Sequence, residues 1–493
     1  MEGTELKRKT FNAVIWALVR VGGSNVLSFG VFMVLARILS PHQFGLFALA
    51  ILMVDIARIV SSAGLSDAII RDKNRDEALA ETAFWANLGL GAMIGALAWV
   101  LTPLYVSAIN EPDIAPVLRT LALLVPVSAL SGIHTACKLR DFGHKAIAGR
   151  TIATGALGGG AAIAAAAAGC GVWSLVIQTA VVDVAGVVFA WQSYPWWPKP
   201  RFDPHRLIAI SGFTGTMMLS QVLGLLLTRM QDLVIGRYIS VSAVGSYRIA
   251  WRMIDLIAQI TIQPLVGVSF VTLSHLQDDP ERFRAAFLRM LGMGALLTFP
   301  AMVGFAVLSD EIVVLLFGPK WAASAEIAKV LTLMAIPFCM NFFIGPALSA
   351  IGRSSAIARG AIVQTAATLL LSCIAAPYGA RWVAAAYVFR AYLTMPYHLS
   401  LFKQGTGIGA FTMAGAILPP FLAALGMAVS LILVRPWLHE MLGHGLLCVT
   451  TSVLFGCLIF AVSLMLLAPR YVRTNVSALM PVLKGRRSEP AVP

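Results

Sequence analysis

Residues 37–50 read Arg37-Ile-Leu-Ser-Pro-His-Gln-Phe-Gly-Leu-Phe-Ala-Leu-Ala, and residues 237–250 read Arg237-Tyr-Ile-Ser-Val-Ser-Ala-Val-Gly-Ser-Tyr-Arg-Ile-Ala. Each stretch runs into a long apolar segment that carries an aspartate. The offset of 200 residues is kept at Ser40 and Ser240, Gly45 and Gly245, Ala50 and Ala250, Met53 and Met253, and Asp55 and Asp255. Similarity at one fixed, long offset is typical of a duplicated architecture. The chain is therefore predicted to consist of two related halves.

The composition is that of a membrane protein. Of the 493 residues, 58% are hydrophobic and only 12% are charged, whereas soluble domains carry roughly 25% charged residues. The apolar residues form runs of about 20 or more, which is the length of a helix that crosses a bilayer. Short alternating segments, as in a transmembrane β-barrel, are absent from the sequence. The predicted fold class is an all-α integral membrane protein.

Hydropathy and turn residues predict about fourteen transmembrane helices. The first apolar run follows Lys7, Arg8 and Lys9, and it is longer than the ~7–15 residue core of a signal peptide, so this helix is expected to stay in the membrane. The predicted spans are 11–36, 44–66, 82–107, 117–137, 147–168, 171–192, 208–236, 242–272, 285–308, 325–350, 357–376, 381–402, 410–434 and 445–468.

Basic residues are distributed unevenly between the two sets of loops. One set, with the tail, holds 24 lysines and arginines, and the alternate loops hold 7, namely Arg37, Arg119, Arg237, Lys320, Lys329, Arg381 and Arg435. Basic loops stay in the cytoplasm, so both termini are predicted to be cytoplasmic. The net charge of +14 is therefore attributed to membrane topology rather than to nucleic-acid binding.

The segment Tyr194-Pro-Trp-Trp-Pro-Lys-Pro-Arg divides the predicted helices into six before it and eight after it. We therefore expect two six-helix lobes related by a pseudo-twofold axis along the membrane normal, with two helices appended. Duplicated membrane chains of this kind are usually transporters with a site between the halves. A second echo supports the repeat, because residues 112–126 resemble residues 322–337. The predicted divisions are a first lobe (1–195), a second lobe (196–405), two appended helices (406–470) and a basic cytoplasmic tail (471–493).

The sequence offers no sign of catalytic or metal chemistry. Its six cysteines are scattered through apolar segments and form neither a CxxC motif nor a cysteine–histidine cluster. Ser-His-Asp, HExxH and phosphate-loop patterns are also absent. His134 and the glycine pair of Gly91-Ala-Met-Ile-Gly95 are interpreted as packing features of their helices. We expect no catalytic residue, no metal site and no cofactor.

Charged side chains inside spanning helices are the best functional candidates, because each costs roughly 2.5–3.5 kcal/mol to insert. Six of them are basic and four are acidic, so the interior is predicted to be net cationic. They are Arg20, Asp55, Arg58, Asp183, Arg229, Asp232, Arg248, Arg252, Asp255 and Arg390.

The spacing of these charges allows two interpretations. Arg248, Arg252 and Asp255 occupy positions i, i+4 and i+7 of one helix face, and Asp55/Arg58 and Arg229/Asp232 are i, i+3 pairs. They could line a shared cavity between the leading helices of the two halves, or they could form ion pairs that fix helix packing. Asp55 or Asp255 could instead bind a coupling proton or sodium ion.

Several motifs together resemble those of bacterial polysaccharide transporters. In the first half these are Leu35-Ala-Arg-Ile-Leu-Ser-Pro-His-Gln-Phe-Gly, Gly64-Leu-Ser-Asp-Ala-Ile-Ile and Gly171-Val-Trp-Ser-Leu-Val, and in the second half Arg229-Met-Gln-Asp-Leu-Val-Ile-Gly-Arg, Leu276-Gln-Asp-Asp-Pro-Glu-Arg-Phe-Arg and Phe317-Gly-Pro-Lys-Trp. Their order and spacing are similar to those of Wzx-type lipid-linked oligosaccharide flippases in the multidrug/oligosaccharidyl-lipid/polysaccharide exporter superfamily. The resemblance extends from about residue 10 to about residue 400.

The resemblance implies alternating access and export of a polyprenyl-diphosphate-linked sugar unit across the bacterial inner membrane, for exopolysaccharide, capsule or O-antigen synthesis. A polysaccharide polymerase and chain-length proteins are the protein partners to test. Guanidinium groups bind phosphate oxygens in a bidentate manner and stay charged at working pH. The expected substrate-binding residues are Arg20, Arg58, Arg229, Arg248 and Arg252, and the expected coupling-ion sites or structural partners are Asp55, Asp232 and Asp255.

Two other functions compete with transport of a lipid-linked sugar. A cation-coupled multidrug exporter of the same superfamily would need an anionic or aromatic pocket, whereas the intramembrane charges here include more arginine than aspartate. A membrane polysaccharide polymerase would need an extended external loop with catalytic groups, and the predicted external connections are short. We therefore expect a transporter and not an enzyme.

Overall fold

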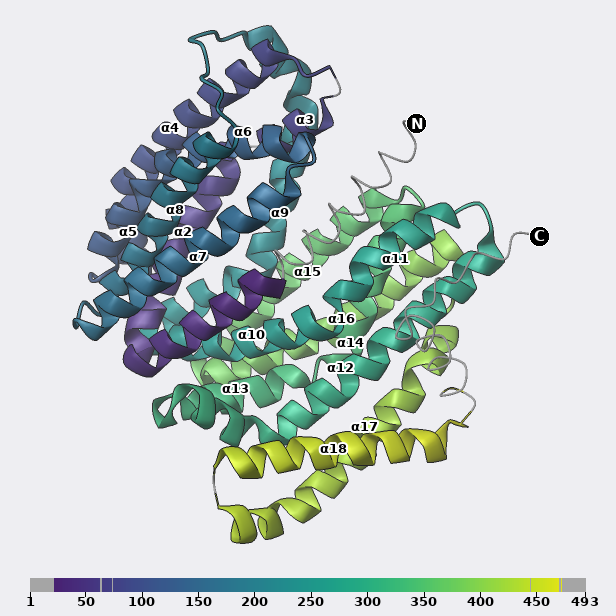
Figure 1. The fold of residues 1–493 in the computed structure, drawn as a ribbon. Helices are drawn as coiled ribbons and strands as arrows, with labels where there is room; N and C mark the ends of the chain where they lie inside the picture. Colours follow the sequence, from purple (N-terminus) through teal and green to yellow (C-terminus); the bar gives the residue numbers. More distant parts are fainter. Residues whose placement is uncertain (1–21, 63, 73, 444, 470, 472–493) are drawn as a thin grey trace. The chain divides into compact units, whose positions relative to one another are not determined.

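In the computed structural model of the chain, every predicted spanning segment after the first lies on a helix or on a pair of helices (Figure 1), and the first is helical over its described residues, from Gly22 onward. The structure describes residues 22–62, 64–72, 74–443, 445–469 and 471, and within these residues it contains helices and no strand. The chain divides into two compact units, Met1–Gly245 and Ser246–Pro493, which we call the first and second units.

The first unit is helical from Gly22 to Ile38. Its further helices are α2 (Pro41–Ser62), α3 (Leu65–Arg71), α4 (Glu77–Ile109), α5 (Ile114–Ala122), α6 (Leu124–Arg140), α7 (His144–Ala167), α8 (Trp173–Ser193), α9 (Pro204–Tyr238) and the first residues of α10 (Val241–Thr261).

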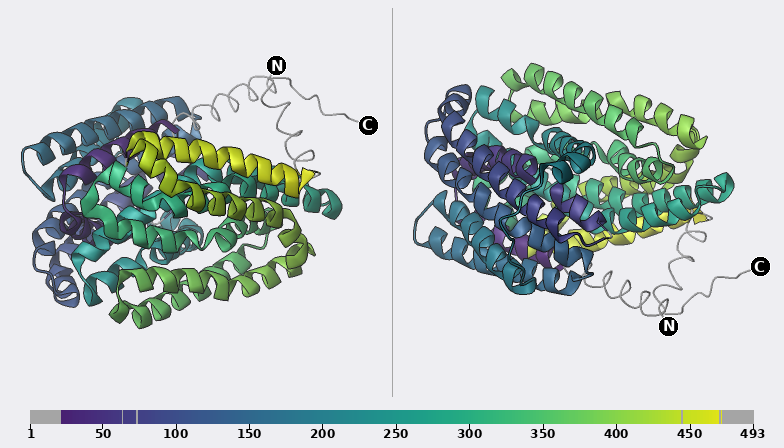
Figure 2. Two further views of the ribbon diagram at one scale, coloured as in Figure 1. Left: turned by 90° about the horizontal axis from the view of Figure 1, so that it is seen from below. Right: turned by 90° about the horizontal axis from the view of Figure 1, so that it is seen from above.

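The second unit begins within α10. Its other helices are α11 (Gln263–His275), α12 (Pro280–Phe317), α13 (Ala322–Thr332), α14 (Ala335–Ala350), α15 (Ser354–Ala375), α16 (Ala380–Thr406), α17 (Ala410–Leu442) and α18 (Leu446–Leu467), with 3₁₀ turns at Pro319–Trp321 and Ala376–Tyr378. In Figure 2, α17 and α18 lie side by side, as their mutual contacts require.

The helices are those of a multi-pass membrane protein. Within the described residues, 9 helices are long and apolar enough to cross a bilayer, or up to 11 if each of two bent pairs counts as one span. The helix from Gly22 to Ile38 is shorter than a full span within the described residues, and α7 and α16 do not meet the same criteria of length and hydropathy. A count of fourteen spans therefore stays a prediction.

The predicted repeat is visible in where helices break. Helix α2 ends at Ser62 and α10 ends at Thr261, and each is followed after a short break by a further helix. Helix α13 likewise bends by 63° into α14, and α5 gives way to α6 at Leu123, at the corresponding point of the second echo. The duplicated sequence thus produces helix breaks at matching positions.

The two copies of the repeated stretch touch each other through their glycines. A Cβ atom built on Gly45 would lie 1.8 Å from the Val241 carbonyl oxygen, and one built on Gly245 would lie 2.0 Å from the Pro41 carbonyl oxygen. Contacts this short exclude any side chain, so both positions require glycine. The first turns of α2 and α10 therefore pack with their backbones in direct contact, entirely within the first unit.

Helix α9 belongs to the first unit, although the repeat assigns it to the second half. It packs against α2, α3 and α4. Asp203 caps its N-terminus by accepting a hydrogen bond from the His205 backbone N–H at 3.0 Å, and Arg206 forms an ion pair with Asp76, the cap of α4. The compact first unit thus extends beyond residue 195, where the predicted first lobe ends.

The tryptophan-rich connection between α8 and α9 is packed onto the same unit. His134 stacks on Trp191 with ring centroids 4.5 Å apart, and its Nε2 atom lies 2.9 Å from the Trp196 carbonyl oxygen. The Trp85 indole donates a hydrogen bond to the Lys199 carbonyl at 2.8 Å. His134 is therefore a packed, hydrogen-bonded residue, as predicted.

A polar cluster joins α17 to α12 in the second unit. Glu311 accepts a hydrogen bond from Arg435 Nε at 2.6 Å, and its Oε1 atom lies 3.0 Å from His439 Nε2. Lys329 of α13 also pairs with the neighbouring Asp310 at 2.6 Å. Helix α17 is thus attached to α12 by charged groups as well as by apolar packing.

Replacing Gly45 with alanine is expected to destabilise the protein by about 1–3 kcal/mol, the usual cost of overpacking. The added methyl group would collide with the Val241 carbonyl, which belongs to a helix backbone and has little freedom to move. The temperature of thermal unfolding of the purified protein in detergent measures the effect. Gly160→Ala in α7 is the matched control, because a Cβ there meets nothing within 4 Å. Equal unfolding temperatures for the two variants would contradict the tight contact.

Replacing Glu311 with glutamine is expected to destabilise the attachment of α17 by about 1.5–3 kcal/mol, because Arg435 loses the carboxylate that accepts its hydrogen bond. The fall in unfolding temperature should be accompanied by faster hydrogen exchange in α17. Glu440→Gln, on the same helix but exposed, is the control and should leave both measurements unchanged. Unaltered exchange in Glu311→Gln would show that apolar contacts alone hold α17.

Candidate functional site

Five charged side chains of the first unit alternate in sign across three helices. In order they are Asp183 of α8, Arg58 and Asp55 of α2, and Arg229 and Asp232 of α9. The described intramembrane candidates of this unit are therefore brought together as one cluster, which we call the five-charge cluster. Charges inserted into spanning helices are costly, and pairing them with opposite charges lowers that cost.

Arg58 and Asp183 form the strongest contact of the five-charge cluster. An Arg58 terminal nitrogen donates a hydrogen bond to Asp183 Oδ2 at 2.5 Å, and the side chains are 25% and 11% exposed. The i, i+3 spacing had indicated Asp55 as the partner of Arg58. The Arg58–Asp183 pair joins positions 125 residues apart. Its only sequence signal is the presence of an aspartate in the otherwise apolar segment of α8.

Asp55 has two arginines near it, and Asp232 has one. Asp55 lies within electrostatic range of both Arg229 and Arg58. Arg229 and Asp232 approach to 3.7 Å as the predicted i, i+3 pair, and the Asp232 side chain is fully buried. The five-charge cluster thus contains three carboxylates and two guanidinium groups, so it carries no excess of positive charge.

Tyr105 adds a further polar group that the sequence analysis did not single out. Its hydroxyl donates a hydrogen bond to the Leu49 carbonyl at 3.0 Å, and this contact links α4 to α2. The Tyr105 hydroxyl also lies within electrostatic range of Asp232. A single tyrosine in an apolar helix forms no spacing pattern, so nothing in the sequence indicated that Tyr105 lies near the five-charge cluster.

The second unit has the opposite balance of charge. Arg248 and Arg252 lie on α10 with Asp255, which is exposed and interacts electrostatically with Arg252. Arg390 of α16 is only 3% exposed, and its guanidinium carbon lies 4.1 Å from the centre of the Tyr387 ring. The intramembrane candidates on these helices are three guanidinium groups and one carboxylate. The predicted cationic character therefore comes from the second unit.

Aromatic side chains surround the arginines of α10 and α16. The Arg248 guanidinium carbon lies 5.7 Å from the centre of the Tyr247 ring, and the Trp251 and Tyr387 rings meet edge to face at 5.1 Å. Ring faces attract cations without neutralising them, so such contacts help to hold a guanidinium group in place without adding a negative charge.

Arg20, the fifth arginine predicted to bind substrate, lies outside the described residues. Of the other four, Arg58 and Arg229 are paired with carboxylates of the first unit, and Arg248 and Arg252 lie in the second. No group of histidine, cysteine, aspartate or glutamate within the described residues could hold a metal ion.

The chain matches the sequence pattern of a family described as polysaccharide biosynthesis protein over residues 34–326. The chain belongs to that family. The succinoglycan biosynthesis transport protein ExoT of Rhizobium meliloti is 27% identical over 358 residues, which cover 72% of each chain. The lipopolysaccharide biosynthesis protein WzxC of Escherichia coli is 25% identical and covers 71% of each chain.

Solved structures confirm that the helices adopt a known transporter fold. The inward closed conformation of the lipid II flippase MurJ matches with a TM-score of 0.76 at 14% sequence identity, covering 94% of this chain and all of that one. An inward-facing multidrug resistance MATE family transporter matches with a TM-score of 0.63 at 16% identity, covering 79% of this chain and 98% of that one. At these identities the likeness concerns the fold alone.

We expect the Arg58–Asp183 pair to show energetic coupling in a double-mutant cycle. Asp183→Asn should destabilise the protein by about 1–3 kcal/mol, because it leaves a half-buried guanidinium group without its carboxylate. Adding Arg58→Gln should cost little more, which gives a coupling of about 0.5–3 kcal/mol. Thermal unfolding of the two single variants and the double variant measures it. Strictly additive effects would show that the two groups do not stabilise each other.

Proposed function

We propose that this protein is a flippase that moves a polyprenyl-diphosphate-linked oligosaccharide across a bacterial inner membrane for surface polysaccharide synthesis. Support comes from its membership of the polysaccharide biosynthesis family and from relatives that are named as a transport protein and as biosynthesis proteins. The multi-pass helical fold, shared with structures named as a flippase and a transporter, adds to it.

The surplus of guanidinium groups on α10 and α16 carries this proposal. The diphosphate of a lipid-linked sugar bears about two negative charges, and transfer of such charges through hydrocarbon without compensation is prohibitive. Arg248 and Arg252 are spaced i, i+4 on one helix face, so both can reach one head group. Their guanidinium groups would replace the hydration of the phosphate oxygens, while the polyprenyl chain stays in the lipid.

In this proposal the five-charge cluster has a structural role. Its arginines are outnumbered by its carboxylates, whereas Arg248 and Arg252 outnumber Asp255 on α10, so Arg58 and Arg229 are weaker candidates for head-group contact than Arg248 and Arg252. Asp55 has guanidinium groups on two sides, and their positive charge opposes the binding of a further cation there. Asp55 and Asp232 therefore serve as packing partners rather than as sites for a coupling ion.

Transport by this proposal follows alternating access between two six-helix halves within about fourteen spans. Both termini face the cytoplasm, because the basic loops stay on that side. The rival function of a multidrug exporter would place an acidic or aromatic pocket around a cationic drug. The five-charge cluster has an excess of a single carboxylate, and arginines lie beside its acidic groups. The aromatic rings of the second unit lie with the intramembrane arginines of α10 and α16, and this positive charge opposes a cationic substrate.

In the Arg248→Ala, Arg252→Ala double variant, polysaccharide export is expected to fall about tenfold or more, because two charge-assisted contacts to the diphosphate are removed. Surface polysaccharide should fall while the lipid-linked precursor accumulates in the cytoplasmic leaflet. The corresponding double lysine variant keeps the charge but loses the bidentate geometry, so its export should be lower than that of the unmodified protein and higher than that of the double alanine variant.

Arg282→Ala is the matched control, since this arginine is 76% exposed at the start of α12. It removes one positive charge from the second unit and should leave export unchanged. Normal polysaccharide from a correctly inserted double alanine variant would contradict the role of the arginines on α10. A strain that lacks the gene, keeps its polysaccharide and becomes drug-sensitive would contradict the proposed function as a whole.

A further inference from the structure

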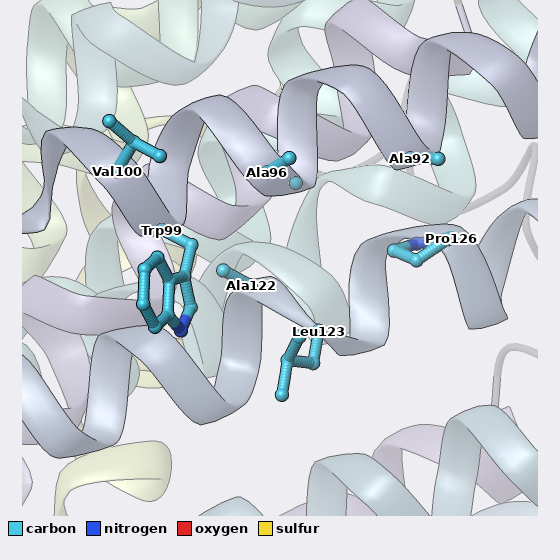
Figure 3. A pocket seen from close by; sticks show the side chains of 8 residues that line it. Ala92, Ala96, Trp99, Val100, Ala122, Leu123 and Pro126 are labelled. Carbon is cyan, nitrogen blue, oxygen red and sulfur yellow. The ribbon is translucent and has the colours of Figure 1, made fainter.

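A separate cavity of about 280 Å³ lies between α4 and the junction of α5 and α6 in the first unit. Figure 3 shows the side chains that line it, with Trp99 on one side and Leu123 and Pro126 on the other. Its floor is made of small residues, including Ala92, Ala96 and Ala122. No member of the five-charge cluster lines it.

Glycine packing explains why the cavity is there. A Cβ on Gly95 would lie 2.8 Å from the Ala122 carbonyl oxygen, and one on Gly91 would lie 3.2 Å from the Ala129 methyl group. Helices α4 and α6 therefore touch along this glycine face, as the GxxxG pattern predicts. Past Gly95 on α4 comes the bulky Trp99, which lines the cavity together with Leu123, the residue at which α5 ends.

The cavity opens on a surface of large apolar side chains. Trp99 is 43% exposed, and Val100 and Leu123 are each 63% exposed. In a multi-pass membrane protein such a surface faces lipid, because apolar side chains outside the protein core can be covered only by hydrocarbon. The occupant of an apolar cavity that opens there is a hydrocarbon chain.

A cation lies at one end of this cavity. The Arg119 guanidinium carbon is 4.9 Å from the centre of the Trp99 ring, and its Nε atom is buried and makes no hydrogen bond to a described residue. Arg119 precedes Leu123 by four residues, so both project from one face of the helix. An arginine held on an indole near a helix end is suited to a lipid phosphate at the membrane interface.

We propose that this cavity binds one acyl chain of an anionic glycerophospholipid whose phosphate contacts Arg119. The chain lies between Trp99 and Leu123, and the head group lies toward the end of α4. Arg119 is among the few basic residues on the side opposite the basic loops, so the lipid comes from the outer leaflet. A single guanidinium group matches the single phosphate of phosphatidylglycerol, whereas a diphosphate carrier would call for a second cation.

Competition between lipids tests the proposal. Purified protein in detergent is mixed with equal amounts of phosphatidylglycerol and phosphatidylcholine, and bound lipid is counted by native mass spectrometry. The unmodified protein should retain one phosphatidylglycerol with about tenfold preference, as expected for one charge-assisted contact. Arg119→Gln should remove the preference but still bind lipid, and Ala96→Phe, which fills the cavity, should weaken binding of both lipids.

Arg381→Gln is the matched control, because this arginine is 67% exposed and lies in the first turn of α16, at an end of the helix that the sequence predicts to be on the same side of the membrane. It should keep the preference. An unchanged preference in Arg119→Gln, or an equal loss in Arg381→Gln, would overturn the proposal. Displacement of the bound lipid by equimolar polyprenyl phosphate would also overturn it, since the cavity would then serve a lipid-linked carrier. If Ala96→Phe does not fold, the comparison of Arg119→Gln with Arg381→Gln still tests whether Arg119 contacts the lipid phosphate.

Discussion

Two glycines placed 200 residues apart in the sequence set the start of the repeated helices. Gly45 and Gly245 each present a bare backbone to a carbonyl of the other copy, at distances that admit no Cβ. Because the contact is reciprocal, α2 and α10 begin at one point of the structure. The aspartates Asp55 and Asp255 follow ten residues later in each copy, or about 15 Å along each helix. Each aspartate therefore follows its own glycine by the same length of helix.

The intramembrane charges of the two units differ in the groups that lie beside them. In the first unit, three carboxylates and two guanidinium groups alternate through α8, α2 and α9, so most of the desolvation cost is offset within the protein. In the second unit, Arg248 and Arg390 lie near tyrosine rings, and Asp255 is exposed. Aromatic rings stabilise a cation without adding a negative charge. This difference separates groups that stabilise the fold from groups suited to a phosphate.

The sequence was sufficient for features that depend on local pattern. Apolar runs predicted the helices, and the GxxxG pattern predicted that α4 packs closely against another helix. The breaks after α2 and α10 were not predicted, because each falls inside a segment that hydropathy gave as one span, 44–66 and 242–272. The sequence was also not sufficient for pairings between distant helices, because hydropathy does not record which helices are neighbours. Asp183 was therefore not identified as the partner of Arg58, and the contact of α17 with α12 through Arg435 and Glu311 was not foreseen.

The attachment of α9 to the first unit has a consequence for how such chains can be recombined. The polar groups of α9 are matched to those of the preceding helices: Arg206 pairs with Asp76, and Arg229 lies near Asp55. A chimaera joined at the proline-rich segment around Trp196 would bring together an α9 and an α4 that had not evolved as partners. The unit that relatives can exchange without mismatched charges runs through α9, so crossovers compatible with folding fall in the turn before α10.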